Sequence, residues 1–133
     1  MKHLLYVEDD RIDRMGFARL MSGQELFQVV MAETIQAAAR LLETERIDLI
    51  LSDQYLPDGD YEDMLALARG VPLVVISGLS SGPVNRPGLY AWLQKPLRLA
   101  QLVAVWNEIE ATRAENLVLD LSYVQALSEG DME

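Results

Sequence analysis

Polar side chains that could act together on a phosphoryl group follow four of the apolar runs in this sequence. They are Glu8, Asp9, Asp10, Asp53, Ser77 and Lys95. Carboxylate oxygens suit Mg²⁺ or Ca²⁺, and carboxylates held in one pocket repel one another unless a cation binds. A lysine ammonium suits a phosphoryl oxygen, and a serine hydroxyl adds a hydrogen-bond donor. If the fold brings these groups together, Asp53 becomes a candidate nucleophile that accepts a phosphoryl group as an aspartyl phosphate.

The residues around Asp53 predict how it is positioned. A run of Ile and Leu over residues 47–51 is typical of a strand buried on both faces, and it ends on Asp53. Leu56-Pro57-Asp58-Gly59 follows, in which Pro and Gly favour a turn. Asp53 is therefore expected at the carboxyl end of an interior strand, which is where open α/β sheets bind ligands.

The rest of the chain alternates between predicted strands and helices. We expect strands at 3–7, 27–32, 48–52, 72–77 and 88–94, and helices at 11–21, 34–44, 62–69 and 97–115. Asp9 or Asp10 could cap the first helix, and Thr34 the second. This alternation predicts an α/β fold, a parallel sheet with helices on both faces. With strand order 2-1-3-4-5, the order reverses between the first and third strands, which brings Glu8, Asp9 and Asp53 together.

Length and composition limit the other classes. The chain has 133 residues, no cysteine, one histidine and a net charge of −10. These values predict one domain without disulfides, make a zinc site unfavourable and argue against direct binding of nucleic acid. The chain has no apolar run long enough to span a membrane, and an acidic residue as early as Glu8 is unlike a signal peptide. A cytoplasmic location without membrane contact is therefore expected.

Four motifs fall in order on the predicted elements and carry a family resemblance. They are Leu4-Leu5-Tyr6-Val7-Glu8-Asp9-Asp10, Asp48-Leu49-Ile50-Leu51-Ser52-Asp53 with Leu56-Pro57-Asp58-Gly59, Val74-Val75-Ile76-Ser77-Gly78, and Leu93-Gln94-Lys95-Pro96. Together they resemble the response-regulator receiver domain of two-component signal transduction. The resemblance covers roughly residues 2–115, which predicts a receiver domain at 1–115, and it implies a flavodoxin-like, doubly wound (βα)₅ fold. It also implies that Asp53 takes phosphate from a histidine kinase or a phosphotransfer protein, with Ser77 and Lys95 as the family's hydroxyl and lysine.

The resemblance further implies a metal site and a switch. Mg²⁺ would be held by Glu8, Asp9, Asp53 and the backbone carbonyl of Tyr55. Trp92, three residues before Lys95, matches the position of the aromatic switch residue. A phosphoryl group adds roughly two negative charges and three acceptor oxygens, so Ser77 is expected to move toward it and Trp92 to turn inward. This change would alter contacts with a downstream protein or effector domain.

Two segments depart from the family pattern. Residues 78–88 contain Pro and Gly where a fourth helix belongs, so that helix is expected to be degenerate. Residues 116–133 form a C-terminal extension that is too apolar for a plain disordered tail. It is interpreted as either an extra helix or a segment that binds a partner, and a homodimer through the last helix and this extension is one alternative. Whether the chain acts alone or belongs to a multidomain protein stays open.

Two other functions compete with the phosphoacceptor. An aspartyl-phosphate phosphatase of the haloacid dehalogenase type needs a second Asp two residues after the nucleophile, but Tyr55 occupies that position. A pseudo-receiver would keep the fold as a binding module without taking phosphate, which the complete set of acidic, hydroxyl and lysine residues disfavours. We therefore expect no enzyme activity beyond the domain's own phosphorylation and dephosphorylation.

Overall fold

A computed structural model describes residues 1–78, 82 and 86–114. The chain divides into two compact units, Met1–Leu99 and Ala100–Glu133. The first unit contains the sheet and all the residues of the predicted site. Nothing in the described range tests the predicted division between a domain at 1–115 and an extension at 116–133.

The first unit is built on a five-stranded parallel sheet with the order β2-β1-β3-β6-β7. Its strands are β1 (Lys2–Val7), β2 (Phe27–Ala32), β3 (Leu49–Asp53), β6 (Leu73–Ser77) and β7 (Leu89–Gln94). Counted along this sheet, the order is 2-1-3-4-5, so the predicted doubly wound, flavodoxin-like architecture is confirmed. The central strand β3 has Leu49, Ile50 and Leu51 fully buried, as its unbroken apolar run requires.

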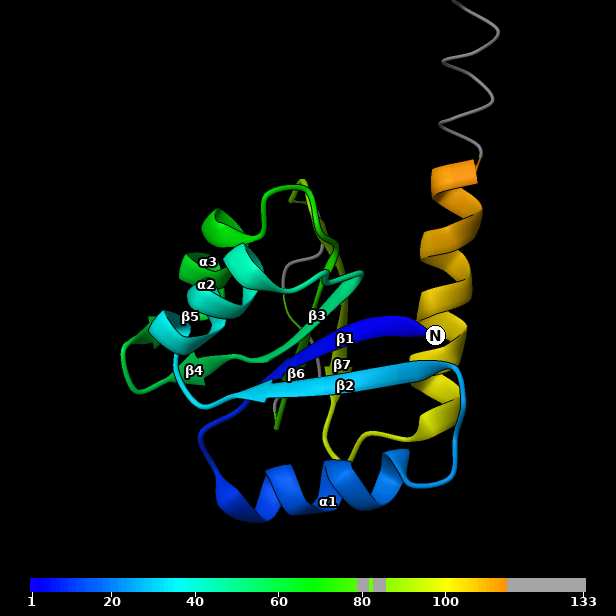
Figure 1. Ribbon diagram of the computed structural model, residues 1–133, viewed down its shortest axis with the longest axis horizontal. Coiled ribbons are helices and arrows are strands. Elements are labelled where there is room, and N and C mark those ends of the chain that lie inside the picture. The colour runs from blue at the N-terminus through cyan, green and yellow to red at the C-terminus, as the bar shows by residue number, and fades with distance from the viewer. Residues whose placement is uncertain (79–81, 83–85, 115–133) are drawn as a thin grey trace, which may run out of the picture. The chain divides into compact units, whose positions relative to one another are not determined.

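Helices cover both faces of this sheet (Figure 1). Helix α1 (Arg11–Met21) lies on one face, and α2 (Ile35–Thr44) and α3 (Tyr61–Leu67) lie on the other. Alternate side chains of β1 pack toward the helices on opposite faces of the sheet. Tyr6 stacks on Phe17 of α1 with ring centroids 4.0 Å apart, whereas Leu5 and Val7 belong to the apolar cluster that includes α2 and α3.

Side-chain caps fix where the helices begin. The Asp10 side chain accepts from the backbone N–H groups of Ile12 and Asp13, so Asp10 rather than Asp9 caps α1. Thr34 caps α2 as predicted. Asp60 caps α3, which begins at Tyr61 and not at the predicted residue 62.

The segment after Asp53 contains a short hairpin that the sequence did not predict. Strands β4 (Tyr55–Leu56) and β5 (Gly59–Asp60) pair antiparallel around the predicted turn. Helix α3 also ends before the predicted residue 69, because Arg69 and Gly70 both adopt positive φ, at 51° and 85°. The hairpin brings the start of α3 back to Gln54, whose carbonyl accepts the N–H of Tyr61 at 3.0 Å.

A last helix covers residues 99–114, close to the predicted range 97–115. None of the helices in the described residues is long and apolar enough to cross a membrane. The predicted degenerate fourth helix falls mostly on residues 79–81 and 83–85, outside the described residues. The predicted extension at 116–133, with its extra helix or partner-binding role and its homodimer alternative, also lies outside them.

Candidate functional site

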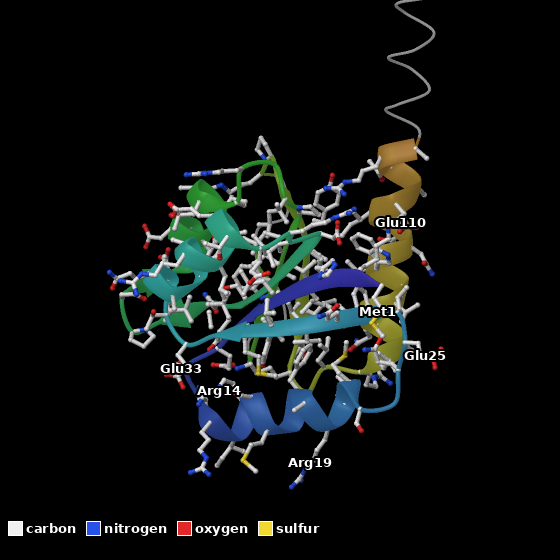
Figure 2. All side chains as sticks on the ribbon, in the orientation of Figure 1. Met1, Arg14, Arg19, Glu25, Glu33 and Glu110 are labelled. Carbon is white, nitrogen blue, oxygen red and sulfur yellow. The ribbon has the colours of Figure 1, made fainter. Side chains whose placement is uncertain are left out.

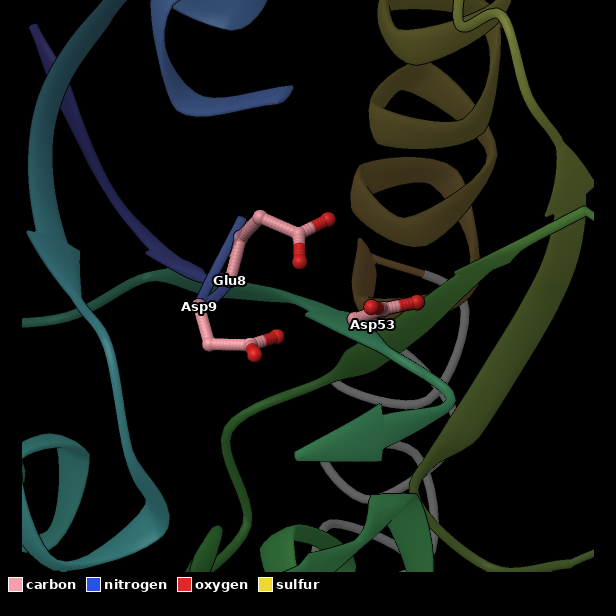
Figure 3. Close-up of side chains that lie close together, drawn as sticks. All are labelled: Glu8, Asp9 and Asp53. Carbon is pink, nitrogen blue, oxygen red and sulfur yellow. The ribbon is translucent and has the colours of Figure 1, made fainter. Parts of the chain in front are cut away.

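Three carboxylates converge at the carboxyl edge of the sheet. Each of Glu8, Asp9 and Asp53 offers an oxygen, and these oxygens all lie within 4.8 Å of one another. Figure 3 shows the three side chains turned toward the same space, with Glu8 and Asp9 directly after β1 and Asp53 at the end of β3. They meet because β1 and β3 are parallel neighbours, with Val7 opposite Ser52. The convergence expected from the sequence is therefore present.

Glu8 is the buried member of this group, with only 1% of its side chain exposed. Burial raises its pKa to about 7; the hydrogen bond from Lys95 works in the opposite direction, and the nearby Asp53 adds to the rise. A carboxyl group with this pKa holds its proton far more readily than an ordinary glutamate. Burying the ionised form of Glu8 costs free energy, and a cation beside the carboxylate reduces that cost.

Lys95 is the cation that the protein itself supplies. Its Nζ lies 2.9 Å from Glu8 Oε1, 2.9 Å from Asp13 Oδ2 and 3.4 Å from Asp53 Oδ1. Burial works to lower the pKa of Lys95, but the bonds to Glu8 and Asp13 outweigh it and hold that pKa above its ordinary value. Lys95 therefore stays charged, and it links the end of β7 to β1, β3 and α1.

Asp13 and Arg14 of α1 belong to the site, although the sequence reasoning missed both. Asp13 binds Lys95 as described. Arg14 Nη1 donates to the backbone carbonyls of Glu8 and Asp9, at 3.1 and 2.7 Å. Its Nη2 also pairs with Glu33 at 2.8 Å, and Figure 2 shows the two side chains near the start of α1 and the end of β2. Arg14 thus fixes the backbone from which the two acidic side chains project.

One oxygen of the Asp53 carboxylate is held by neighbouring groups, and the side chain is partly exposed to solvent. Its Oδ1 accepts the N–H of Gln54 at 2.9 Å and lies 3.4 Å from Lys95 Nζ. The Asp53 side chain also interacts with Glu8, and it is 19% exposed. A reactant from solvent can therefore reach the Asp53 carboxylate, one oxygen of which is already held in place.

Ser77 ends β6, and Lys95 directly follows the neighbouring strand β7. The backbone N–H of Lys95 donates to the carbonyl of Ser77 at 2.8 Å, and Asp53 is opposite Ile76 in the sheet. The Ser77 hydroxyl is buried and donates to Gln54 Oε1 at 2.7 Å. Ser77 is thus in the predicted place, but its hydroxyl is bound to a side chain that the sequence reasoning did not single out.

The remaining predicted residues lie around this centre. Asp10 caps α1 and is not a member of the carboxylate group. The Tyr55 side chain is exposed, and the assignment of its carbonyl to a metal stays a prediction. Trp92 packs edge-on against Tyr61, with ring centroids 5.2 Å apart, and its buried Nε1 has no hydrogen-bond partner among the described residues. The indole already lies against the apolar cluster, and its movement on phosphorylation stays a prediction.

The donor set fits a hard divalent cation. All three clustered groups present carboxylate oxygens, and one of them is buried. Mg²⁺ is bound in proteins by a few carboxylates together with water, which is the set that Glu8, Asp9 and Asp53 provide. With three carboxylates near the single charge of Lys95, a cation would relieve the repulsion that remains.

Comparisons with known proteins point to one kind of domain. The KDP operon transcriptional regulatory protein KdpE of Escherichia coli (strain K12) is 32% identical over 111 residues, which cover 78% of this chain and 49% of KdpE. The transcriptional regulatory protein PdtaR of Mycobacterium tuberculosis is 29% identical over 133 residues, covering 91% of this chain and 65% of PdtaR. A scan against models of protein families gave no match.

Solved structures give the same result for the fold. A CheY-like response regulator receiver domain protein from Methanospirillum hungatei JF-1 superposes with a TM-score of 0.73 at 22% identity, covering 87% of this chain and 98% of that one. The resemblance to the response-regulator receiver domain is therefore confirmed. The chain covers between 23% and 65% of the length of the curated relatives that it matches.

Proposed function

From a receiver-domain fold that carries these acidic, hydroxyl and lysine residues, we propose that the chain is a phosphoacceptor switch. Asp53 takes a phosphoryl group from a histidine kinase or a phosphotransfer protein, and the change alters contacts with a downstream protein or effector domain. The observation that carries the proposal is the site itself. A partly exposed Asp53 lies beside two further carboxylates and the ammonium of Lys95 at one edge of a parallel sheet.

The proposed reaction is a simple group transfer. A carboxylate oxygen of Asp53 forms a bond to phosphorus while the bond from phosphorus to the donor's oxygen or nitrogen breaks, and the donor leaves with that electron pair. Asp53 Oδ1 accepts from Gln54 and lies near Lys95, so the other oxygen, Oδ2, is the proposed nucleophile. Lys95 supplies positive charge to the transferred group, and Arg14 keeps the acidic loop in place.

Glu8, Asp9 and Asp53 are the residues proposed to hold Mg²⁺, with the backbone carbonyl of Tyr55. When bound, Mg²⁺ would supply positive charge that offsets the repulsion between the carboxylates and an incoming phosphate. The proposal includes no separate substrate and no enzyme activity beyond self-phosphorylation and self-dephosphorylation. It also includes a cytoplasmic location.

Intact-mass spectrometry after incubation with acetyl phosphate and Mg²⁺ tests this function. We expect the wild-type chain to gain one phosphoryl group and Asp53→Asn to gain none. Asp58→Asn is the matched control, because Asp58 is an exposed carboxylate in the next turn, and an asparagine oxygen can still accept one of the two backbone N–H groups that Asp58 binds. No gain in the wild type, under conditions that label another receiver domain, would support the pseudo-receiver instead.

A further inference from the structure

Gln54 makes a direct contact with the hydroxyl that the proposed switch uses. The Ser77 hydroxyl donates a hydrogen bond of 2.7 Å to Gln54 Oε1. Ser77 is only 3% exposed, so solvent has little access to this bond. The contact joins the end of β6 to the residue immediately after Asp53. A group added to Asp53 would therefore arrive beside an existing bond.

The backbone of Gln54 is held on both sides. Its N–H donates to Asp53 Oδ1 at 2.9 Å, and its carbonyl accepts from the N–H of Tyr61 at 3.0 Å. Because both backbone groups are engaged, the side chain projects from a fixed point at the start of the β4–β5 hairpin. The amide oxygen is thus a positioned acceptor and differs from a glutamine side chain on an open surface.

We propose that Gln54 is a positioning residue that holds the Ser77 hydroxyl in the unphosphorylated protein and releases it when Asp53 carries a phosphoryl group. The inference rests on the proposed function of Asp53. A hydroxyl has one hydrogen to donate, so Ser77 cannot donate to Gln54 and to a phosphoryl oxygen at the same time.

Moving the Ser77 hydrogen bond from Gln54 to a phosphoryl oxygen is favourable. The gain in free energy is smaller than it would be if Gln54 offered no acceptor. Phosphoryl oxygens are ionised acceptors, and hydrogen bonds to them are stronger than bonds to a neutral amide oxygen. Forming the new bond requires loss of the hydrogen bond that Ser77 donates to Gln54. Gln54 therefore sets how strongly a phosphoryl group can draw Ser77 toward it.

Beryllium fluoride with Mg²⁺ provides a stable analogue of the phosphoryl group for the test. Gln54→Leu removes the acceptor and leaves an apolar side chain that is one atom shorter. The net strength of one hydrogen bond corresponds to roughly a two- to tenfold change in an equilibrium, so this variant is expected to bind beryllium fluoride about two- to tenfold more tightly. Gln28→Leu, an exposed residue of β2, is the matched control and is expected to match the wild type.

The Ser77→Ala background separates positioning from a general effect on structure. Without the hydroxyl donor, adding Gln54→Leu is expected to leave the affinity for beryllium fluoride unchanged. An equal gain in both backgrounds, or no gain in either, overturns the inference. If Gln54→Leu fails to fold by circular dichroism, Gln54→Asn, whose oxygen is one methylene short of Ser77, takes its place in the same cycle.

The same measurements distinguish failure of this inference from failure of the proposed function on which it rests. A wild-type chain that neither takes a phosphoryl group from acetyl phosphate nor binds beryllium fluoride would refute the proposed function and the role of Gln54 together. A wild-type chain that does both, with Gln54→Leu giving identical affinity, would refute only the role of Gln54.

Discussion

Glu8 is expected to make Mg²⁺ binding depend on pH in the neutral range. Burial raises the pKa of this carboxyl group to about 7 in the metal-free protein. A protonated carboxyl group is a poor ligand, so the proton and Mg²⁺ compete for Glu8. Mg²⁺ affinity should therefore fall as the pH falls through the neutral range, whereas a site of ordinary carboxylates would stay ionised there.

The size of the effect follows from the fraction of Glu8 that is ionised. With a pKa of about 7, about nine-tenths of Glu8 is ionised at about pH 8 and about one-tenth at about pH 6. The apparent affinity for Mg²⁺ should therefore weaken about tenfold between these pH values, which corresponds to about 1.4 kcal/mol. Binding at the lower pH should also release close to one proton for each metal ion bound.

Isothermal titration calorimetry in buffers of different ionisation heats measures both quantities. Glu8→Gln cannot titrate, so its weaker binding should show no such pH dependence. Asp10→Asn is the matched control, because asparagine caps a helix as well as aspartate and Asp10 is not in the carboxylate group. An affinity for Mg²⁺ that stays constant across this range in the wild type would refute the reasoning about Glu8.

Two further predictions concern residues that support the site. Asp58 accepts the backbone N–H groups of Ile35 and Gln36 at 2.9 and 3.0 Å, so Asp58→Ala should lower the free energy of unfolding by about 1 kcal/mol in urea titrations, and Asp58→Asn by less. These bonds lower the pKa of Asp58, so its contribution should be present above the unfolded pKa and be lost as the pH falls through the folded value. Gly82 lies against the Trp92 indole, where an added Cβ would collide with the ring. In a Trp106→Phe background, Gly82→Ala should change the tryptophan emission, and an unchanged spectrum would contradict this packing.

The sheet and the acidic centre could be predicted because their signals are local. Each buried strand is an apolar run, and parallel strands bring their carboxyl ends to one edge whatever the details of the loops. Asp53, Ser77 and Lys95 are all within a residue of a strand end, so their convergence follows from topology alone. The caps were also predictable in part, since Thr34 and Asp10 immediately precede helical runs.

The contacts within the site could not be predicted because they depend on side-chain directions set by distant packing. In the sequence, Asp13 and Arg14 are ordinary charged residues of an amphipathic helix. In the structure, Asp13 binds Lys95, a residue 82 positions away. The sequence indicates only that Gln54 is a loop residue. Its backbone is fixed by the hairpin of β4 and β5, which the sequence did not predict. Two-residue strands carry too little pattern to be recognised, so the hairpin and the Ser77 contact were missed together.

The two groups proposed to receive the phosphoryl oxygens already have partners in the unphosphorylated site. Ser77 donates to Gln54, and Lys95 binds Glu8 and Asp13. The free energy available for switching is therefore the difference between new bonds and existing ones, which is smaller than the strength of the new bonds alone. Of these existing partners, Gln54 and Asp13 are not among the clustered carboxylates. Their side chains can therefore set the balance between the two states while the phosphoacceptor and its metal ligands stay the same.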